Sequence, residues 1–227
     1  MSKLKERAAG FVVVTFGRPC SGKDEQGKFL QGHFQKIFGA DGVDYLVCSE
    51  LLNWRKKAHD TLAAEITNAF RECTTTRLLP SGIVCEAVGE HFECLLKTVK
   101  FVVLNGFPRD YEQGLRLKKI VGHDRIVAVK LEVPREMALH RATKRKQGRP
   151  EDVLEAAIIR QDIYEAEEPG LIQALNEKNV PIIPIDATPE LEQVSDELRM
   201  ELEGFFQFQL PAEKHARQHL IPLSRVV

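Results

Sequence analysis

The sequence predicts an α/β fold in which helices cover both faces of a parallel sheet, giving three layers. The run from Phe11 to Phe16 is apolar, β-branched and free of polar alternation, as expected for a strand that is buried on both faces. Further apolar runs alternate along the chain with stretches of helical periodicity, and no repeat or low-complexity tract interrupts them. A hydrophobic fraction of 43% over 227 residues is enough for a globular core.

A phosphate-binding motif follows this first strand directly. Residues 17–23, Gly-Arg-Pro-Cys-Ser-Gly-Lys, fit the G-x-x-x-x-G-K part of the P-loop. In that motif backbone N–H groups surround a phosphate at a helix N-terminus, and the lysine reaches the outer phosphates. Asp24 and Glu25 stand where most P-loops have Ser or Thr. The alternative interpretation is a glycine-rich turn with a surface lysine.

The first half of the chain continues with helix, strand and two more helical stretches. Apolar spacing predicts a helix from Asp24 to about Phe38, and residues 44–48 have the composition of a short strand. Residues 49–77 favour helix, and Ser49 has the chemistry of an N-cap. After the Pro-Ser-Gly interruption at 80–82, an amphipathic pattern predicts another helix.

The second half repeats the alternation. Strands are predicted at 100–105, 125–133 and 180–186, and helices at 134–146, 151–164 and from Thr188-Pro189 to about Phe206. The last strand contains two prolines, which suits only a sheet edge. Residues 207–227 have no clear periodicity and are interpreted as a C-terminal extension.

Composition excludes some classes of function and sets expectations for others. A net charge of -1 gives no overall attraction to nucleic acid or membrane. The five cysteines form no C-x-x-C pair, and the polar N-terminus lacks the apolar region of a signal peptide. No segment has the length and hydropathy of a membrane span. We therefore expect a cytoplasmic, monomeric protein that binds small molecules.

Taken together, the motifs resemble the adenylate kinases and the wider nucleoside monophosphate kinase family over about residues 10–206. The family's G-x-P-G-x-G-K-[GT]-T-Q loop is similar to residues 17–26, and its D-G-F-P-R-x-x-x-Q signature is similar to residues 105–113. Its short lid is matched by Arg141, Arg145, Gly148-Arg149 and Arg160, and its downstream Tyr and Glu-Pro by Tyr164 and Glu168-Pro169. The resemblance implies a five-stranded parallel sheet of order 2-3-1-4-5.

The resemblance also implies a reaction and its residues. The reaction is reversible phosphoryl transfer from Mg-ATP to AMP, giving two ADP, within a domain at 10–206. Residues 49–82 would bind the acceptor, and 142–152 would form a short lid. The implied catalytic residues are Lys23, Arg109, Arg145, Arg149 and Arg160. The implied donor-binding residues are Gly17, Pro19, Cys20, Ser21, Gly22, Lys23, Asp24, Glu25 and Arg141. The implied acceptor-binding residues are Cys48, Asn53, Gly106, Arg109 and Gln113, with Gln113 selecting adenine.

Four positions depart from the family pattern. Asp24 and Glu25 replace a small residue and Thr, so that two carboxylates stand where donor phosphate should bind. Asn105 replaces the aspartate that in the family holds magnesium through water, a role that Glu25 could take over. Asn53 replaces an arginine for the acceptor phosphate, and Lys56 or Lys57 could substitute for it. No residue is expected to bind metal directly; Mg²⁺ would enter with ATP near Glu25 or Asn105. The alternative function is a weak or silent kinase-fold scaffold or regulatory protein.

Overall fold

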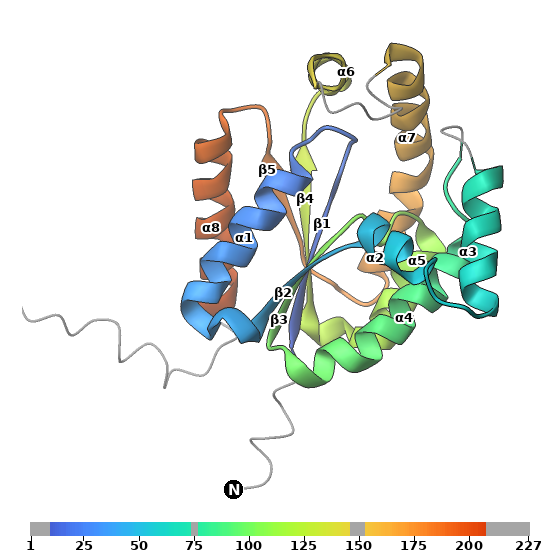
Figure 1. The fold of residues 1–227 in the computed structure, drawn as a ribbon. Coiled ribbons are helices and arrows are strands. Elements are labelled where there is room, and N and C mark those ends of the chain that lie inside the picture. The colour runs from blue at the N-terminus through green and yellow to red at the C-terminus, as the bar shows by residue number, and fades with distance from the viewer. Residues whose placement is uncertain (1–9, 74–76, 146–152, 208–227) are drawn as a thin grey trace, which may run out of the picture.

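The computed structural model describes residues 10–73, 77–145 and 153–207 and has five parallel strands in one sheet (Figure 1). The strands are β1 (Phe11–Gly17), β2 (Val43–Val47), β3 (Phe101–Asn105), β4 (Ile126–Glu132) and β5 (Ile182–Asp186). Their order is β2-β3-β1-β4-β5, and every neighbouring pair is parallel. The predicted fold class and strand order are therefore confirmed, with the proline-containing β5 at an edge.

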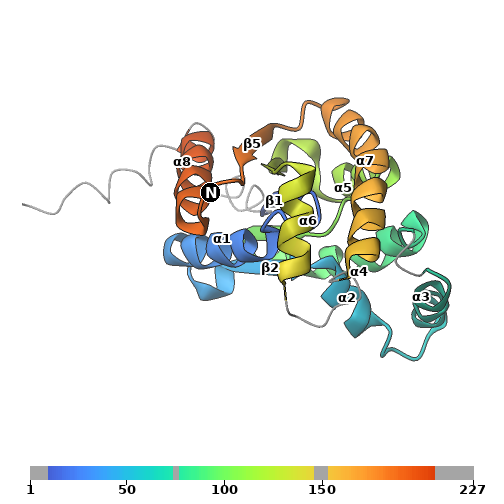
Figure 2. The same cartoon turned by 90° about the horizontal axis from the view of Figure 1, so that it is seen from above.

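Helices cover both faces of the sheet. They are α1 (Lys23–Phe38), α2 (Cys48–Arg55), α3 (Thr61–Glu72), α4 (Ser81–Thr98), α5 (Tyr111–Val121), α6 (Arg135–Lys144), α7 (Leu154–Asn176) and α8 (Leu191–Gln207). Helices α1 and α8 pack on one face, and α4, α5 and α7 lie on the other (Figures 1 and 2). Helix α6 lies above the carboxyl ends of the strands (Figure 1). Among the described helices, none has the length and apolar composition needed to cross a membrane.

The two hydrophobic cores explain why the β1 sequence lacks polar alternation. Val12 and Val14 belong to the core under α4, α5 and α7, whereas Val13 belongs to the core under α1 and α8. In the second core the rings of Phe34 and Phe101 lie 3.8 Å apart between centroids. Both faces of β1 are thus buried, as an apolar and β-branched run predicts.

The strand order places a crevice at the carboxyl end of β1. From β1 the sheet runs through β3 to β2 in one direction and through β4 to β5 in the other. Ligands of open α/β sheets bind outside the carboxyl ends of the strands at such a reversal. The register sets Thr15 of β1 beside Asn105 of β3, so the segment after β1 and the polar end of β3 lie next to each other.

The predicted helix over residues 49–77 is instead two helices, and Ser49 is not its N-cap. Helix α2 begins at Cys48, and Val47 stands at its N-cap position. The chain restarts as α3 because Asp60 accepts a hydrogen bond from the Ala63 N–H at 2.9 Å. Arg55, the last residue of α2, donates to Asp60 at 2.9 Å and thereby fixes the break.

The two C-terminal helices also differ from prediction. Helix α7 extends to Asn176 through Pro169, beyond the predicted end at Tyr164. Its C-terminal half packs on α5 so closely that a Cβ on Gly114 would lie 2.8 Å from Cβ of Ala174. This packing outweighs the hydrogen bond that a proline removes. Helix α8 begins at Leu191, because the Asp186 carboxylate accepts from the Thr188 N–H at 2.9 Å and holds a turn there.

Candidate active site

A cavity of about 1420 Å³ opens at the carboxyl ends of the strands. All but one of the predicted site residues line it. They are Gly17, Pro19, Cys20, Ser21, Gly22, Lys23, Asp24, Glu25, Cys48, Asn53, Gly106, Arg109, Gln113, Arg141, Arg145 and Arg160. Arg149, with most of the predicted lid at 142–152, lies outside the described residues. Pockets for single small ligands usually enclose roughly 300–1,000 Å³. This cavity therefore has room for more than one ligand of that size.

The loop after β1 has the backbone geometry of a phosphate cradle. Gly17 has φ 145°, and a Cβ there would lie 2.4 Å from the Leu131 carbonyl oxygen of β4. Cys20 and Gly22 also have positive φ, at 64° and 95°, and Gly22 stands at the N-cap of α1. Alternating backbone conformations of this kind turn successive N–H groups toward one point at a helix N-terminus.

Lys23 is folded over the loop. Its Nζ donates to the carbonyl oxygens of Gly17 at 2.8 Å and Arg18 at 2.6 Å. The pKa of Lys23 is lowered to about 8. Loss of hydration on burial is the largest cause, and the positive charge of Arg109 is the second. Two cations from different strand ends thus face the same part of the cavity. An anion bound between them would relieve their repulsion.

Asp24 and Asn105, two of the residues that depart from the family pattern, are in contact. Asn105 Nδ2 donates to Asp24 Oδ1 at 2.7 Å and to Tyr45 Oη at 3.0 Å. Tyr45 Oη in turn donates to the Asp24 carbonyl oxygen at 3.5 Å. Burial raises the pKa of Tyr45 to about 12, so its hydroxyl is protonated and available as a donor. Asp24 Oδ1 is thus directed to the end of β3.

On the acceptor side, Arg109 depends on the glycine three residues before it. Arg109 Nε donates to the Gly106 carbonyl oxygen at 2.8 Å. Gly106 has φ 80°, and a Cβ there would lie 3.2 Å from Arg109 Nη2. Only glycine adopts this backbone readily and leaves room for the guanidinium group. Burial raises the pKa of the neighbouring Cys48 thiol to about 11, which keeps it uncharged.

The Gln113 side chain is held by hydrogen bonds to the residues just before it in the chain. Its Oε1 accepts from the Arg109 N–H at 2.9 Å, and its Nε2 donates to Asp110 Oδ2 at 2.7 Å. Asp110 also caps α5 by accepting from the Gln113 N–H at 2.8 Å. The side chain is fixed in one orientation at the cavity wall. Its predicted contact with an adenine stays a prediction.

Asn53 stands where the family pattern has an arginine, and neither Lys56 nor Lys57 takes the place of that arginine. Helix α2 ends at Arg55, and Lys56 Nζ lies over the ring of Phe70 at 4.1 Å from the centroid. Neither Lys56 nor Lys57 belongs to the described residues that line the cavity. Arg77, between α3 and α4, does line it and is 61% exposed. Sequence reasoning missed Arg77, because an isolated basic residue between two helices carries no signal.

The remaining arginines approach the cavity from α6 and α7. Arg141 Nη2 donates to the Ala187 carbonyl oxygen at 2.9 Å, which places the guanidinium beside the segment after β5. Within the part of the chain that the structure describes, buried Nε of Arg160 has no hydrogen-bond partner. A buried donor without a partner is costly unless a ligand completes it.

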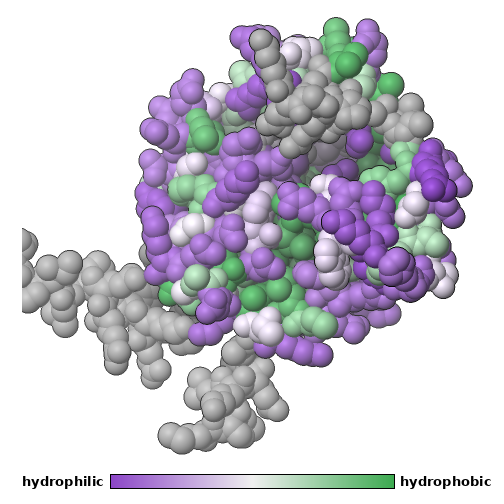
Figure 3. Space-filling model, viewed as in Figure 1, coloured by the Kyte–Doolittle hydropathy of each residue, from purple (hydrophilic) through white to green (hydrophobic). Residues whose placement is uncertain are grey.

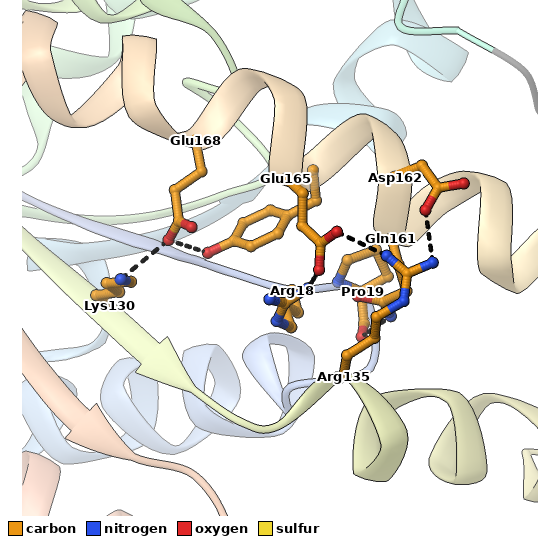
Figure 4. Close-up of polar contacts among 9 residues, drawn as sticks. Arg18, Pro19, Lys130, Arg135, Gln161, Asp162, Glu165 and Glu168 are labelled. Atoms are coloured by element: carbon orange, nitrogen blue, oxygen red, sulfur yellow. Dashed lines mark hydrogen bonds and ion pairs between the residues drawn. The ribbon is translucent and has the colours of Figure 1, made fainter.

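A polar network ties the loop to α7 (Figure 4). Glu165 lies between Arg18 of the loop, at 2.5 Å, and Arg135 at the start of α6, at 2.7 Å. Gln161 Nε2, one turn before Glu165, donates to the Pro19 carbonyl oxygen at 3.1 Å. The Arg18 guanidinium also lies 5.4 Å from the centroid of the Tyr164 ring. The network therefore fixes the loop relative to the helix that carries Arg160.

A second group of contacts anchors α7 to the sheet nearby. Lys130 of β4 pairs with Glu168 at 3.0 Å, and the Tyr164 hydroxyl donates to the same carboxylate. Arg18 lies inside the loop motif, yet no motif indicates that Glu165 would be its partner. Gln161 and Glu165 are four residues apart in the sequence, but only the folded structure shows that both contact the loop.

The described surface is mainly polar on the face that Figure 3 shows. Hydrophilic side chains cover most of the described surface there, and hydrophobic side chains lie in separate areas (Figure 3). The strongly exposed apolar residues Trp54, Val153 and Met200 belong to three different elements or their flanks. Single exposed apolar residues of this kind are normal on a protein surface.

The fold and the site define a class: an α/β protein with a five-stranded parallel sheet, a loop of P-loop sequence after β1 and several arginines around one large cavity. The chain matches no protein-family profile. It is 29% identical to an adenylate kinase of Parabacteroides distasonis over 67% of the chain and 77% of that relative. It is 28% identical to an adenylate kinase of Bacteroides thetaiotaomicron over 70% of the chain and 82% of the relative. It is also 26% identical to UMP-CMP kinase 2 of Oryza sativa, over 69% of the chain and 59% of the relative.

These relatives confirm the predicted resemblance to the adenylate kinase and nucleoside monophosphate kinase family. The similarity covers most of the described chain and agrees with the observed strand order.

Proposed function

We propose that this protein is a nucleoside monophosphate kinase of adenylate kinase type, which transfers a phosphoryl group reversibly from Mg-ATP to AMP. The observation that carries the proposal is the convergence of Lys23 and Arg109 on one cavity large enough for two ligands. Phosphoryl transfer requires two anionic nucleotides to be held in line, and the cations that hold them must come from different elements.

The bond changes follow from the chemistry of the substrates. An oxygen of the AMP phosphate attacks the γ-phosphorus of ATP, and the bond from that phosphorus to the bridging β–γ oxygen breaks. The β-phosphate of the donor leaves with the electron pair, so both products are ADP. The protein supplies positioning and positive charge.

The chain's residues divide these tasks. Lys23 and the loop N–H groups would bind the β- and γ-phosphates of the donor. Arg145, Arg149 and Arg160 would surround the transferred group, where the unpartnered Nε of Arg160 supports an anionic ligand. Arg109 would bind the acceptor phosphate. Arg141, fixed beside Ala187, would lie against the donor adenine.

The side-chain oxygen atoms of the loop and the start of α1 suit a magnesium ion that enters with the nucleotide. Mg²⁺ prefers oxygen ligands and keeps several waters, using one or two carboxylates together with phosphates. Asp24, Glu25 and Ser21 present such oxygens along the loop side of the cavity. When bound, the ion would neutralise charge on the β- and γ-phosphates.

The regional assignments and the setting are part of the same proposal. Residues 10–206 would form the kinase domain, with the acceptor at 49–82, a closing lid at 142–152 and an extension at 207–227. The protein would act as a cytoplasmic monomer. A specific observation favours the alternative function of a weak or silent scaffold: no described lysine near Asn53 lines the cavity.

A coupled assay of ADP formation tests the proposal. Purified protein is given ATP with Mg²⁺ and, in separate reactions, AMP, CMP, UMP or GMP. We expect AMP to be the preferred acceptor, because the resemblance to adenylate kinases assigns Gln113 to the acceptor adenine; its amide would exchange contacts with Arg109 and Asp110 for two atoms of the base edge. Preference for CMP or UMP would contradict the adenylate assignment. No turnover with any acceptor, in a protein that melts normally, would favour the scaffold.

A further inference from the structure

We propose that Asp24 supplies the carboxylate that orients the hydrated magnesium ion of the donor nucleotide, and that Asn105 and Tyr45 are positioning residues that hold this carboxylate. The inference rests on the proposed function, since it assumes that the loop binds a triphosphate. It assigns a role to a residue whose charge would otherwise only oppose phosphate binding.

Three elements converge on the Asp24 carboxylate or its backbone. Asp24 lies in the first turn of α1, Asn105 at the end of β3 and Tyr45 in β2. The Asn105 amide, only 3% exposed, donates to Asp24 Oδ1 and to Tyr45 Oη. Tyr45 reaches this point because Gly27 has no side chain; a Cβ there would lie 2.4 Å from the tyrosine ring.

This arrangement sets the direction of the Asp24 carboxylate. Oδ1 accepts from the end of β3, on the wall of the cavity beside the loop. An aspartate at position 105 would place a second negative charge against the first. The pair of Asp24 with Asn105 therefore keeps one carboxylate and one amide at this contact.

Glu25 is the competing candidate, and its environment fits the role less well. Glu25 also lines the cavity, but its side chain is exposed to solvent. A flexible and hydrated carboxylate must lose both freedom and water before it can orient a metal–water shell. Asp24 has already lost that freedom in the free protein.

Loss of the Asp24 charge should change the affinity for metal-free nucleotide and the affinity for the magnesium complex in opposite directions. Without a metal ion, the Asp24 carboxylate repels the triphosphate; with Mg²⁺ bound to the triphosphate, it attracts the complex. Removing its charge should therefore improve binding of metal-free nucleotide and impair binding of the magnesium complex. A residue that only stabilises the loop would change both affinities in the same direction.

Calorimetric titration with a non-hydrolysable ATP analogue, in Mg²⁺ and in EDTA, tests this. For Asp24→Asn we expect about tenfold weaker binding in Mg²⁺ and tighter binding in EDTA. The reversed pair, Asp24→Asn with Asn105→Asp, returns one carboxylate to the same contact and should recover most of the magnesium effect. Tyr45→Phe should reduce the magnesium effect partially, and Glu25→Gln, which tests the competing carboxylate, should reduce it less than Asp24→Asn does. The control Glu93→Gln, an exposed change on α4, should leave it unchanged.

Other outcomes would overturn the inference and separate it from the proposed function. Equal changes in Mg²⁺ and EDTA would make Asp24 a structural residue. Loss of the magnesium effect in Glu25→Gln alone would assign the role to Glu25. Both results leave a nucleotide-binding protein. Failure of the unaltered protein to bind the analogue under either condition would instead refute the proposed function, and the inference with it.

Discussion

The donor and acceptor sides of the cavity both depart from the family pattern, but with different consequences. Three residues depart on the donor side, and two of them, Asp24 and Asn105, meet each other at 2.7 Å, so a carboxylate is retained across their contact. On the acceptor side Asn53 makes no such exchange: Lys56 lies over the ring of Phe70, and Arg77, which lines the cavity between α3 and α4, pairs with Glu72 at 4.0 Å. The carboxylate that is missing at Asn105 is thus balanced by the carboxylate of Asp24. The positive charge that is missing at Asn53 has no counterpart in contact with it among the described residues.

The two sides also differ in how their key cation is held. The loop that carries Lys23 is joined to α7 through Arg18, Glu165 and Gln161. The Arg109 guanidinium donates to the carbonyl oxygen of Gly106, three residues earlier in the chain. Donor binding should therefore respond to changes in α7, and acceptor binding should respond to changes near Asn53.

The largest expected effect comes from removing the cation of the donor side. Lys23→Ala should lower turnover by about 10²- to 10³-fold, because a positioned charge on the transferred group is lost. The melting temperature should change little, because in the described part of the chain the hydrogen bonds of the Lys23 ammonium group go to the loop itself. The coupled assay measures turnover. Lys36→Ala, an exposed change near the end of α1, is the control and should have normal activity.

Unaltered turnover in Lys23→Ala would show that the loop does not hold the donor phosphate. The donor side of the cavity would then have no advantage over the acceptor side.

The next effect should appear on the acceptor side. Asn53→Arg adds a guanidinium group to the cavity wall and should tighten AMP binding by about tenfold, the strength of one charge-assisted hydrogen bond. Binding of the ATP analogue should be unchanged. Asn53→Gln, which lengthens the side chain without adding charge, should have no such effect. Equal tightening by both variants would show that charge is not what this side lacks.

The lowered pKa of Lys23 predicts a pH dependence of donor binding. The free protein holds Lys23 with a pKa of about 8, and a bound phosphate favours its charged form. Affinity should therefore be level near pH 7 and fall by about tenfold by pH 9, as the free lysine loses its proton. Lys23→Arg stays charged and should show a flat profile. Proton uptake on binding at pH 8.5, measured by calorimetry in two buffers, is an independent check.

The smallest effect concerns the network between loop and α7. Hydrogen bonding to Arg18 is the main reason that the pKa of Glu165 is lowered from 4.5. The pair is partly exposed, so Glu165→Gln should reduce the free energy of unfolding by less than about 1 kcal/mol. A lowered pKa stabilises the folded state above the unfolded value and loses this stabilisation as the pH falls.

Denaturation at several pH values measures this effect. Wild type and Glu165→Gln should differ at neutral pH and converge well below pH 4.5. Glu93→Gln, an exposed change on α4, should match the wild type throughout. A difference that persists in acid would mean that the glutamine disturbs packing and not an ion pair.

Much of this fold could be predicted from the sequence because its signals are local. The β1 run, its following loop and the prolines of β5 each carry their meaning within a few residues. The residues that follow β1 and β3 were also predictable, because the carboxyl ends of parallel strands share one edge. The arginines of α6 and α7 were implied only by the resemblance to the kinase family.

What could not be predicted depends on distant partners. Asp24 and Asn105 are 81 residues apart, and only the folded sheet shows that each faces the other. The break between α2 and α3 follows from Asp60 acting as both a cap and a partner of Arg55. The extension of α7 through Pro169 follows from packing on α5, which overrides the local tendency of proline to end a helix.

Separate titrations of the unaltered protein with AMP and with the magnesium complex of a non-hydrolysable ATP analogue test the central claim most directly. Because the donor side keeps Lys23 and a carboxylate for the magnesium complex, whereas Asn53 stands where the family pattern has an arginine, we expect the analogue to bind at least about tenfold more tightly than AMP. Equal or tighter binding of AMP would contradict the account, because the acceptor side would then need no arginine at position 53.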